Sequence, residues 1–288
     1  MKAERVLVVG AGQMGQGIAQ VMAASGRDVM LVDERKEAPV EAKERILRIL
    51  SKREKQGKAA KGEARAIVGR IQTPQRLCLD GVGLVIEAIV EERSAKERLF
   101  SMLGKRSDPE TVLASNTSSI PINVLAAAAE RGGETVGMHF MNPVPLMPLV
   151  EVVAGEETRE EVVLWVEALS REIGKTPVRS ADRPGFISNR ILMPMINEAI
   201  RALEEGVGGV EAIDSVMELG MRHPMGPLKL ADLIGLDTCL AILEVLHAEW
   251  GDGRHRPARL LRKMVEKGTL GRKTGEGFHT YDRHLWKK

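Results

Sequence analysis

The sequence predicts an α/β protein with a larger N-terminal domain of alternating strands and helices and a smaller, all-α C-terminal domain. Three observations support this class. Short β-branched apolar runs alternate with stretches of helical spacing, a glycine cluster follows the first apolar run, and the sequence from residue 183 onward has only helical periodicity. We expect the two domains of the 288-residue chain to be residues 1–182 and 183–288, both within the usual size range for domains.

The N-terminal domain begins with a βαβ unit. Val6–Val9 and Val29–Val32 are apolar runs typical of buried strands, and the spacing of Ile18, Val21 and Met22 predicts a helix between them. Further strands are expected at residues 82–89, 112–114, 136–139, 149–153 and 176–178, with helices at 40–56, 95–103 and 160–173. Strands separated by helices favour a parallel sheet that is covered on both faces.

The C-terminal domain is expected to contain four helices. Several of them begin at a proline and end at a glycine, as helices commonly do. Their ranges are 186–205, 210–221, 227–250 and 257–267.

Composition and charge exclude several classes of protein. The chain has 42 Lys and Arg against 40 Asp and Glu, a formal charge of +2, so nothing global indicates a nucleic-acid or membrane partner. Three Trp, one Tyr and four Phe are too few for a platform on which several bases stack. No stretch approaches the roughly 18 apolar residues of a membrane helix. We therefore expect no nucleic-acid and no membrane partner.

Cysteine and histidine usage indicates a cytoplasmic protein without a metal. Cys78 and Cys239 lie far apart and form no CxxC pair, so neither a disulfide framework nor a thiolate zinc site is expected. The six histidines show no HExxH or similar ligand spacing. The N-terminus has too few consecutive apolar residues, and is too acidic, for a signal peptide.

A glycine motif follows the first predicted strand. Gly10, Gly12 and Gly15 belong to GAGQMG, which also includes Gln13 and Met14. Gly10 allows a tight turn, Gly12 lets the backbone approach a pyrophosphate, and Gly15 lets helix and strand pack closely, while the helix N-terminus favours negative charge. Its position between a strand and a helix predicts a Rossmann-type dinucleotide-binding domain.

Asp33 ends the second strand, 18 residues after Gly15. A carboxylate at this place accepts hydrogen bonds from the ribose 2′-hydroxyl and repels a 2′-phosphate, so it predicts NAD as the cofactor rather than NADP. The alternative is a solvated acid at a strand end, and the neighbouring Arg35 could soften the discrimination between the two cofactors.

His139 is the candidate general base. It closes a short apolar strand, where a Rossmann-type sheet binds its ligands, and its side chain can accept the proton of an alcohol near neutral pH. Glu151 lies between two valines on the next apolar run, where a buried carboxylate needs a partner such as a histidine. From spacing alone, a backbone-bonded histidine and a solvent-facing glutamate are about as well supported as a catalytic pair.

Segments spread from Val6 to Tyr281 resemble the L-3-hydroxyacyl-CoA dehydrogenase family, and most closely its short bacterial 3-hydroxybutyryl-CoA dehydrogenase type. The segments that carry this resemblance are GAGQMGQGIAQVMA, EAIVEERSAKERLF, ASNTSSIPI, GMHFMNPVPLMPLVEVV, DRPGFISNRIL, HPMGPLKLADLIGLD and GRKTGEGFHTYD. The resemblance implies the reversible, NAD-dependent oxidation of L-3-hydroxyacyl-CoA to 3-ketoacyl-CoA.

The resemblance also implies roles for four residues in catalysis. His139 removes the 3-hydroxyl proton and Glu151 orients its imidazole, while Ser118 and Asn189 bind the oxygens of the substrate; Ser118 is also placed near the cofactor. The alternative for Ser118 is a helix N-cap before Ile120, and for Asn189 an ordinary polar helix position.

Further implied residues contact the cofactor and coenzyme A. Glu91 and Lys96 reach the nicotinamide ribose, Asn142 lies near the nicotinamide, and Lys273 approaches from the C-terminal side; for the two lysines, a solvated surface position is the alternative. Lys52 and Lys55, in a basic run at 52–61, are the candidates for binding the phosphates of coenzyme A, although a charge run is usually a solvated face.

By the same resemblance, the C-terminal helices form a homodimer interface. Two rival functions are kept: a related dehydrogenase of a sugar acid, of the L-gulonate type, and a non-catalytic NAD-binding relative.

Overall fold

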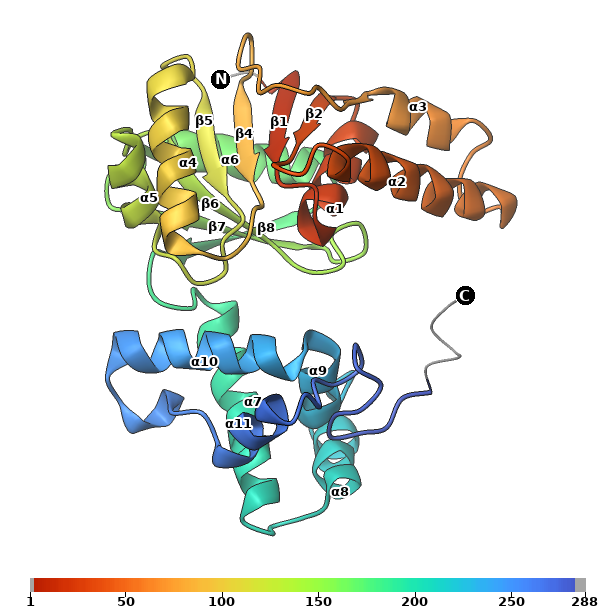
Figure 1. The fold of residues 1–288 in the computed structure, drawn as a ribbon, viewed down its shortest axis with the longest axis vertical. Helices are drawn as coiled ribbons and strands as arrows, with labels where there is room; N and C mark the ends of the chain where they lie inside the picture. The colour runs from red at the N-terminus through yellow and green to blue at the C-terminus, as the bar shows by residue number, and fades with distance from the viewer. Residues whose placement is uncertain (1–2, 283–288) are drawn as a thin grey trace. The chain divides into compact units, whose positions relative to one another are not determined.

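The computed structural model describes residues 3–282, and the chain divides after Phe186 into two compact units (Figure 1). The first unit is α/β and the second is helical, which agrees with the predicted fold class. The expected boundary after residue 182, and the roles given to the two domains, stay predictions.

An eight-stranded sheet lies at the centre of the first unit (Figure 1). Its strands, in spatial order, are β3 (Ile71–Gln72), β2 (Asp28–Val32), β1 (Arg5–Val9), β4 (Leu84–Glu87), β5 (Val112–Ser115), β6 (Thr135–Phe140), β7 (Leu149–Ala154) and β8 (Thr176–Ala181). The first six pair in parallel in the order 3-2-1-4-5-6, which is the order of a Rossmann sheet. The predicted Rossmann-type fold is therefore confirmed.

The last two strands run in the opposite direction, so the expected parallel arrangement does not hold for the whole sheet. β6 and β7 pair antiparallel, and β8 is parallel to β7. Only residues 141–148 connect β6 to β7, without a helix, whereas a parallel crossover needs a dozen residues or more. The chain therefore turns straight back, and this places His139 directly opposite Glu151.

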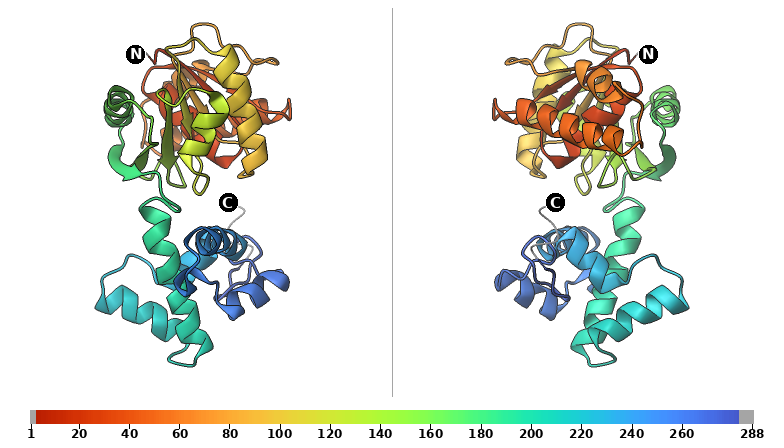
Figure 2. Two further views of the ribbon diagram at one scale, coloured as in Figure 1. Left: turned by 90° about the vertical axis from the view of Figure 1, so that its left-hand side faces the viewer. Right: turned by 90° about the vertical axis from the view of Figure 1, so that its right-hand side faces the viewer.

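Helices cover both faces of the sheet, as predicted. The two views of Figure 2 show α4 and α5 on one side and α2 on the other. Along β1, Val6 and Val8 pack in one core and Leu7 and Val9 in the other, which explains why the strand is apolar throughout. The first core is closed by α1 (Gln13–Ala24), α2 (Ala38–Lys55), α3 (Glu63–Gly69) and α6 (Glu160–Glu172), and the second by α4 (Arg93–Arg106) and α5 (Ile122–Ala129).

The second unit is built around one apolar core of its own. Its helices are α7 (Ser188–Glu204), α8 (Val210–Ser215), α9 (Pro227–Ile234), α10 (Leu236–Trp250) and α11 (Arg259–Glu266), with a π-helical turn at Val216–Gly220 and a 3₁₀ turn at Gly253–His255. None of the helices in the described part of the chain combines the length and the apolarity that a membrane span requires.

The single helix expected over residues 227–250 is wrong. Gly235 has a φ of +105°, outside the helical range, and the chain starts a new helix at Leu236. A side chain there would also approach Lys273, since a Cβ at Gly235 would lie 3.1 Å from its Nζ. The glycine therefore separates α9 from α10.

Candidate active site

The glycine loop between β1 and α1 has the geometry that its sequence predicts. Gly10 has a φ of +105°, and a Cβ there would lie 2.4 Å from the carbonyl oxygen of Ala88. A Cβ at Gly15 would lie 1.8 Å from the oxygen of Gly10, so helix and loop could not pack this closely with any larger residue. At Gly12, the N-cap of α1, a Cβ would meet no protein atom within 4 Å. Two glycines thus shape the turn, and the third leaves backbone accessible at a helix N-terminus, which fits a pyrophosphate.

Asp33 is tied to this loop, so the alternative of a merely solvated strand-end acid is wrong. Its Oδ2 accepts a hydrogen bond from the backbone N–H of Ala11 at 2.7 Å, and its Oδ1 accepts one from Arg35 N–H at 2.9 Å. Each carboxylate oxygen can accept a further bond, such as one from a ribose hydroxyl. The Arg35 guanidinium turns to Glu41, at 2.8 Å, which weakens its ability to attract a 2′-phosphate.

The loop also contacts the end of β6. Gln13 Nε2 donates to Asn142 Oδ1 at 3.0 Å, and Met14 packs against the core beneath. Two residues that were predicted to bind the cofactor from segments far apart in sequence are therefore neighbours.

His139 and Glu151 form a buried pair on the antiparallel strands β6 and β7. His139 Nδ1 lies 2.7 Å from Glu151 Oε2, and the histidine is 8% exposed and the glutamate 1%. Because the two residues are directly opposite in register, the contact is a cross-strand pair. The alternative of a backbone-bonded histidine beside a solvent-facing glutamate is therefore wrong.

His139 also has an aromatic contact that the sequence did not predict. The ring of Phe186 lies 5.8 Å from that of His139, centroid to centroid, and packs with Ile122 and Val153. Phe186 has a φ of +48°, which is uncommon for a bulky residue, and follows Gly185, whose φ is +82°. A proline-glycine pair before an aromatic residue is the only signal in the sequence that could have indicated this turn.

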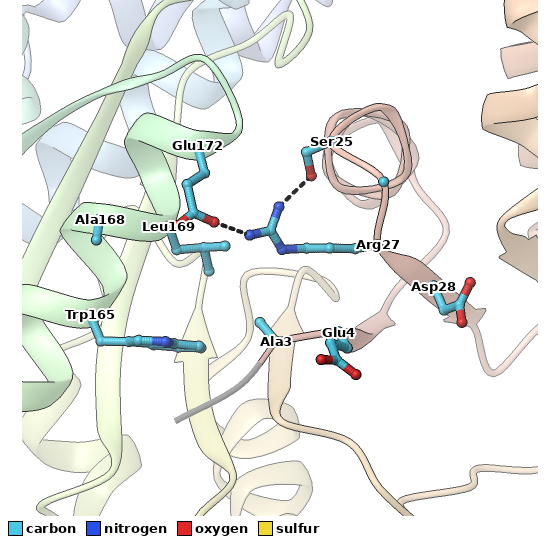
Figure 3. A pocket seen from close by; sticks show the side chains of 10 residues that line it. Ala3, Glu4, Ser25, Arg27, Asp28, Trp165, Ala168, Leu169 and Glu172 are labelled. Carbon is cyan, nitrogen blue, oxygen red and sulfur yellow. Dashed lines mark hydrogen bonds and ion pairs between the residues drawn. The ribbon is translucent and has the colours of Figure 1, made fainter.

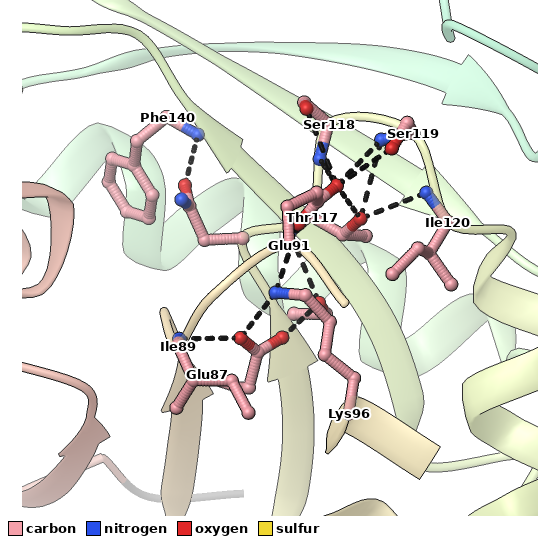
Figure 4. Close-up of polar contacts among 11 residues, drawn as sticks. Glu87, Ile89, Glu91, Lys96, Thr117, Ser118, Ser119, Ile120 and Phe140 are labelled. Carbon is pink, nitrogen blue, oxygen red and sulfur yellow. Dashed lines mark hydrogen bonds and ion pairs between the residues drawn. The ribbon is translucent and has the colours of Figure 1, made fainter. Parts of the chain in front are cut away.

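Glu91 anchors the loop that contains Ser118 (Figure 4). Its Oε1 accepts hydrogen bonds from Thr117 Oγ1 at 2.5 Å, from Ser118 N–H at 2.9 Å and from Ser119 N–H at 3.1 Å. Burial acts to raise the pKa of Glu91, but the Lys96 charge and these hydrogen bonds outweigh it and hold the pKa below its ordinary value. The N-cap alternative for Ser118 is wrong, because α5 begins only at Ile122 and its N-cap is Pro121.

Lys96 is buried beneath this loop, which rules out the solvated-lysine alternative. It is only 1% exposed, and its Nζ lies 2.5 Å from Glu87 Oε1 and 3.1 Å from Glu91 Oε2. Glu87, the last residue of β4, is wholly buried and was not predicted. An acid inside the apolar run LVIEAIV could have indicated it, by the argument that selected Glu151.

Family comparisons agree with this geometry. The NAD-binding domain model of 3-hydroxyacyl-CoA dehydrogenase matches residues 5–183, and the C-terminal domain model of the same family matches residues 185–281. The chain belongs to the 3-hydroxyacyl-CoA dehydrogenase family. This membership confirms three predictions: the resemblance, the enzyme class, which is that of an NAD-binding oxidoreductase, and NAD as the cofactor.

This chain is similar to individual members of the family over almost their whole length. A Deinococcus radiodurans protein named "Probable 3-hydroxybutyryl-CoA dehydrogenase" is 54% identical over 95% of this chain and 99% of its own. The 3-hydroxybutyryl-CoA dehydrogenase of Bradyrhizobium diazoefficiens is 48% identical over 96% of this chain and 95% of its own. The crystal structure of the (S)-3-hydroxybutyryl-CoA dehydrogenase of Ralstonia eutropha matches with a TM-score of 0.93 at 42% identity, over 98% of this chain and 100% of that one.

Two of the residues predicted from the 3-hydroxyacyl-CoA dehydrogenase resemblance belong to the helical unit. Asn189 lies in the first turn of α7 and is buried, and Lys273 is half-exposed and pairs with Asp237 at 2.5 Å. The ion pair gives Lys273 a structural role within its own unit. Whether the two residues also serve the site stays a prediction.

Lys52 and Lys55 are exposed in the last turn of α2. Cations there are favoured by the helix dipole, which is a structural role for both lysines. Their contact with coenzyme A stays a prediction.

A pocket of about 700 Å³ lies at the amino ends of β1 and β2, opposite the carboxyl edge of the sheet (Figure 3). It is lined by Glu4, Asp28 and Trp165, and by Arg27, which donates to Ser25 at 2.6 Å and pairs with Glu172. None of the predicted site residues lines it. Because Rossmann sheets bind ligands at the carboxyl ends of their strands, the predicted site is expected at the edge that contains Asp33, Glu87 and His139.

Proposed function

We propose that the protein oxidises the 3-hydroxyl group of an L-3-hydroxyacyl-CoA, such as 3-hydroxybutyryl-CoA, to the 3-ketone, and that the reaction is reversible. The names of its relatives support this substrate class. The observation that carries the proposal is the buried His139–Glu151 pair at the carboxyl edge of a dinucleotide-binding sheet.

The chemistry assigned to this pair is general base catalysis. When bound, NAD accepts the hydride that leaves C3 of the substrate. Nε2 of His139 takes the hydroxyl proton in the same step, and Glu151 accepts a hydrogen bond from Nδ1–H, which fixes the tautomer and stabilises the imidazolium that forms. In the reverse direction the imidazolium returns the proton to the ketone oxygen.

Ser118 and Asn189 are assigned to the oxygens of the substrate. The Glu91 carboxylate supports Ser118 because it accepts hydrogen bonds from the loop on both sides of it. A hydroxyl and an amide are suited to this task, since they supply hydrogen-bond donors without adding charge. Lys52 and Lys55 are assigned to the phosphates of coenzyme A.

We assign the cofactor to residues on both sides of the switch point, the place between β1 and β4 where the strand order of the sheet reverses. The glycine loop would hold the pyrophosphate and Asp33 the adenosine ribose. The remaining candidates for contacts with the cofactor are Gln13, Met14, Glu91, Lys96, Ser118, Asn142 and Lys273.

A cytoplasmic homodimer, formed through the helical unit, completes the proposal. Large apolar side chains of that unit are exposed in the single chain, among them Ile191, Val207, Leu219 and Met221, and a pocket of about 510 Å³ between α7 and α8 is lined mainly by apolar side chains. Exposed apolar patches of this kind commonly mark interfaces. Both cysteines are free thiols, as in a reducing compartment.

One assay tests the activity. We expect the protein to consume NADH when it is mixed with acetoacetyl-CoA, followed by the loss of NADH absorbance. Consumption with a keto sugar acid and not with acetoacetyl-CoA would support the sugar-acid alternative. Binding of NADH without consumption of either substrate would support a non-catalytic relative.

A charge-reversal variant tests the coenzyme A contacts. Replacing Lys52, Lys55 and Lys58 together by Glu should raise KM for the CoA ester and leave KM for NADH unchanged, because only the ester carries the additional phosphates. Equal effects on both constants would remove these lysines from the substrate site.

A further inference from the structure

Glu87, Lys96 and Glu91 form a cluster of two carboxylates and one ammonium group (Figure 4). Glu87 receives hydrogen bonds from Ser115 Oγ at 2.6 Å, from Ile89 N–H at 2.7 Å and from Lys96. Glu91 likewise faces donors from the loop at 117–119. In all of these contacts the carboxylate oxygens act as acceptors, which is the hydrogen-bonding pattern of a carboxylate.

The cluster therefore has one excess negative charge. Lys96 can balance only one of the two carboxylates. Glu87 and Lys96 are almost fully buried, so water screens their charges much less than it screens a surface pair. The field of the cluster consequently extends to whatever binds above it.

The topology places this charge under one half of a bound dinucleotide. The strand order reverses between β1 and β4, and Glu87 is paired with Val9 across that switch point. Asp33 follows β2 on the adenosine side. The nicotinamide half would then extend over β4 and β5 towards His139 at the end of β6.

We propose that the Glu87–Lys96–Glu91 cluster makes this site discriminate between the two redox forms of the cofactor and favours the oxidised one. The oxidised nicotinamide ring is positively charged and the reduced ring is neutral, whereas the pyrophosphate charge is the same in both. A negative charge near the ring therefore stabilises the oxidised form selectively. The inference rests on the proposed function, because it assumes that the site holds a nicotinamide cofactor.

The test is the ratio of two dissociation constants in Glu87→Gln. This substitution keeps the size of the side chain and removes one negative charge. For a unit charge about 10 Å away at an effective dielectric constant of about 30, we expect Kd for NAD⁺ divided by Kd for NADH to rise about sixfold. Calorimetry gives the first constant, and NADH fluorescence gives the second.

The outcomes separate an electrostatic role from a purely structural one. If both constants change by the same factor and the ratio stays within about twofold, the proposal is overturned, because loosened packing would weaken both forms alike. Failure of the unmodified protein to bind either form would overturn the proposed function, and the inference with it.

Three further variants complete the experiment. Glu97→Gln removes the same charge from a solvent-accessible pair with Arg93 on the same helix, and Ser115→Ala removes a hydrogen bond to Glu87 but no charge; both should leave the ratio unchanged. If thermal unfolding shows that the E87Q chain does not fold, Glu91→Gln takes its place and should raise the ratio in the same direction. An unchanged ratio in a folded E91Q chain would overturn the proposal.

Discussion

Each unit of the molecule contains a histidine held against a carboxylate, at the same distance and through the same ring nitrogen. In the α/β unit, His139 Nδ1 lies 2.7 Å from Glu151; in the helical unit, His255 Nδ1 lies 2.7 Å from Asp252. The second nitrogen differs. Nε2 of His255 lies 2.5 Å from Arg190 Nη1, whereas no group within residues 3–282 forms a hydrogen bond with Nε2 of His139.

The difference separates the proposed base from a structural histidine. His255 is 0% exposed, and its Nε2 lone pair is used as the acceptor for Arg190, so it cannot take a proton from a substrate. Its ring also stacks on Trp250, over which the Arg190 guanidinium lies. A histidine–carboxylate contact therefore indicates catalysis only where the other nitrogen is available.

The largest expected effect is the loss of turnover in His139→Gln. Without the imidazole no group at this position accepts the hydroxyl proton, and we expect kcat to fall about 10³-fold. Steady-state kinetics with acetoacetyl-CoA measure the fall, and NADH fluorescence should show that the cofactor still binds.

His255→Gln is the matched control for this variant. It should leave kcat close to that of the unmodified protein. Near-normal turnover in H139Q, or an equal fall in both variants, would end the distinction between the two histidines.

Next in size is the effect of Glu151→Gln. The amide can still accept a hydrogen bond from Nδ1–H, but it no longer stabilises the imidazolium by charge, so we expect kcat to fall about 30-fold with KM little changed. Asp252→Asn makes the same change in the helical unit and should leave kcat unaffected. A fall in kcat confined to the Asp252 variant would reverse the assignment of the two pairs.

Much of the fold could be predicted because local pattern decides it. β1, α1 and β2 follow from apolar periodicity and from a glycine loop in which Gly10 and Gly15 have no room for a side chain. The reversed direction of β7 depends on the short connection before it, and the break at Gly235 on one left-handed backbone conformation. The short elements α3, β3 and α5 are not amphipathic over enough residues to be distinguished from loops.

The candidate site was predictable where a residue has one possible task and not where its task depends on a distant partner. Asp33 and the three glycines needed only their position after a strand. The burial of Lys96 could not be inferred, because its partner Glu87 lies on a strand, outside its own helix. Phe186 was missed because an aromatic residue after a glycine is most simply explained by packing.

A smaller effect, on stability rather than on turnover, is expected for His255→Phe. The phenyl ring removes the acceptor of the half-buried Arg190 guanidinium, and we expect the free energy of unfolding to fall by about 1 kcal/mol. Urea unfolding measures it. His255→Gln should lose less, because an amide supplies both a donor and an acceptor; an equal loss would show that ring packing, and not the hydrogen bonds, stabilises this corner.

The smallest expected effect is a pH dependence that distinguishes the two units by their acids. Asp252 has a pKa held below its ordinary value of 3.8 by the hydrogen bond from His255, and Glu91 has one held below 4.5 because Lys96 and the loop at 117–119 outweigh its burial. A carboxyl group whose pKa is lower in the folded protein stabilises the fold fully above its unfolded pKa, and this contribution is lost as the pH falls through the folded value.

Urea unfolding between neutral and acid pH should therefore separate the two residues. At pH 7, Glu91→Gln should destabilise the protein by about 1 kcal/mol or less, because the carboxylate is more than one third exposed and is partly screened by solvent. The difference between E91Q and the unmodified protein should begin to shrink below about pH 4.5, and that for Asp252→Asn only below about pH 3.8. A difference that stays constant down to the acid limit would mean that the lost stability comes from altered packing rather than from the charge of the acid.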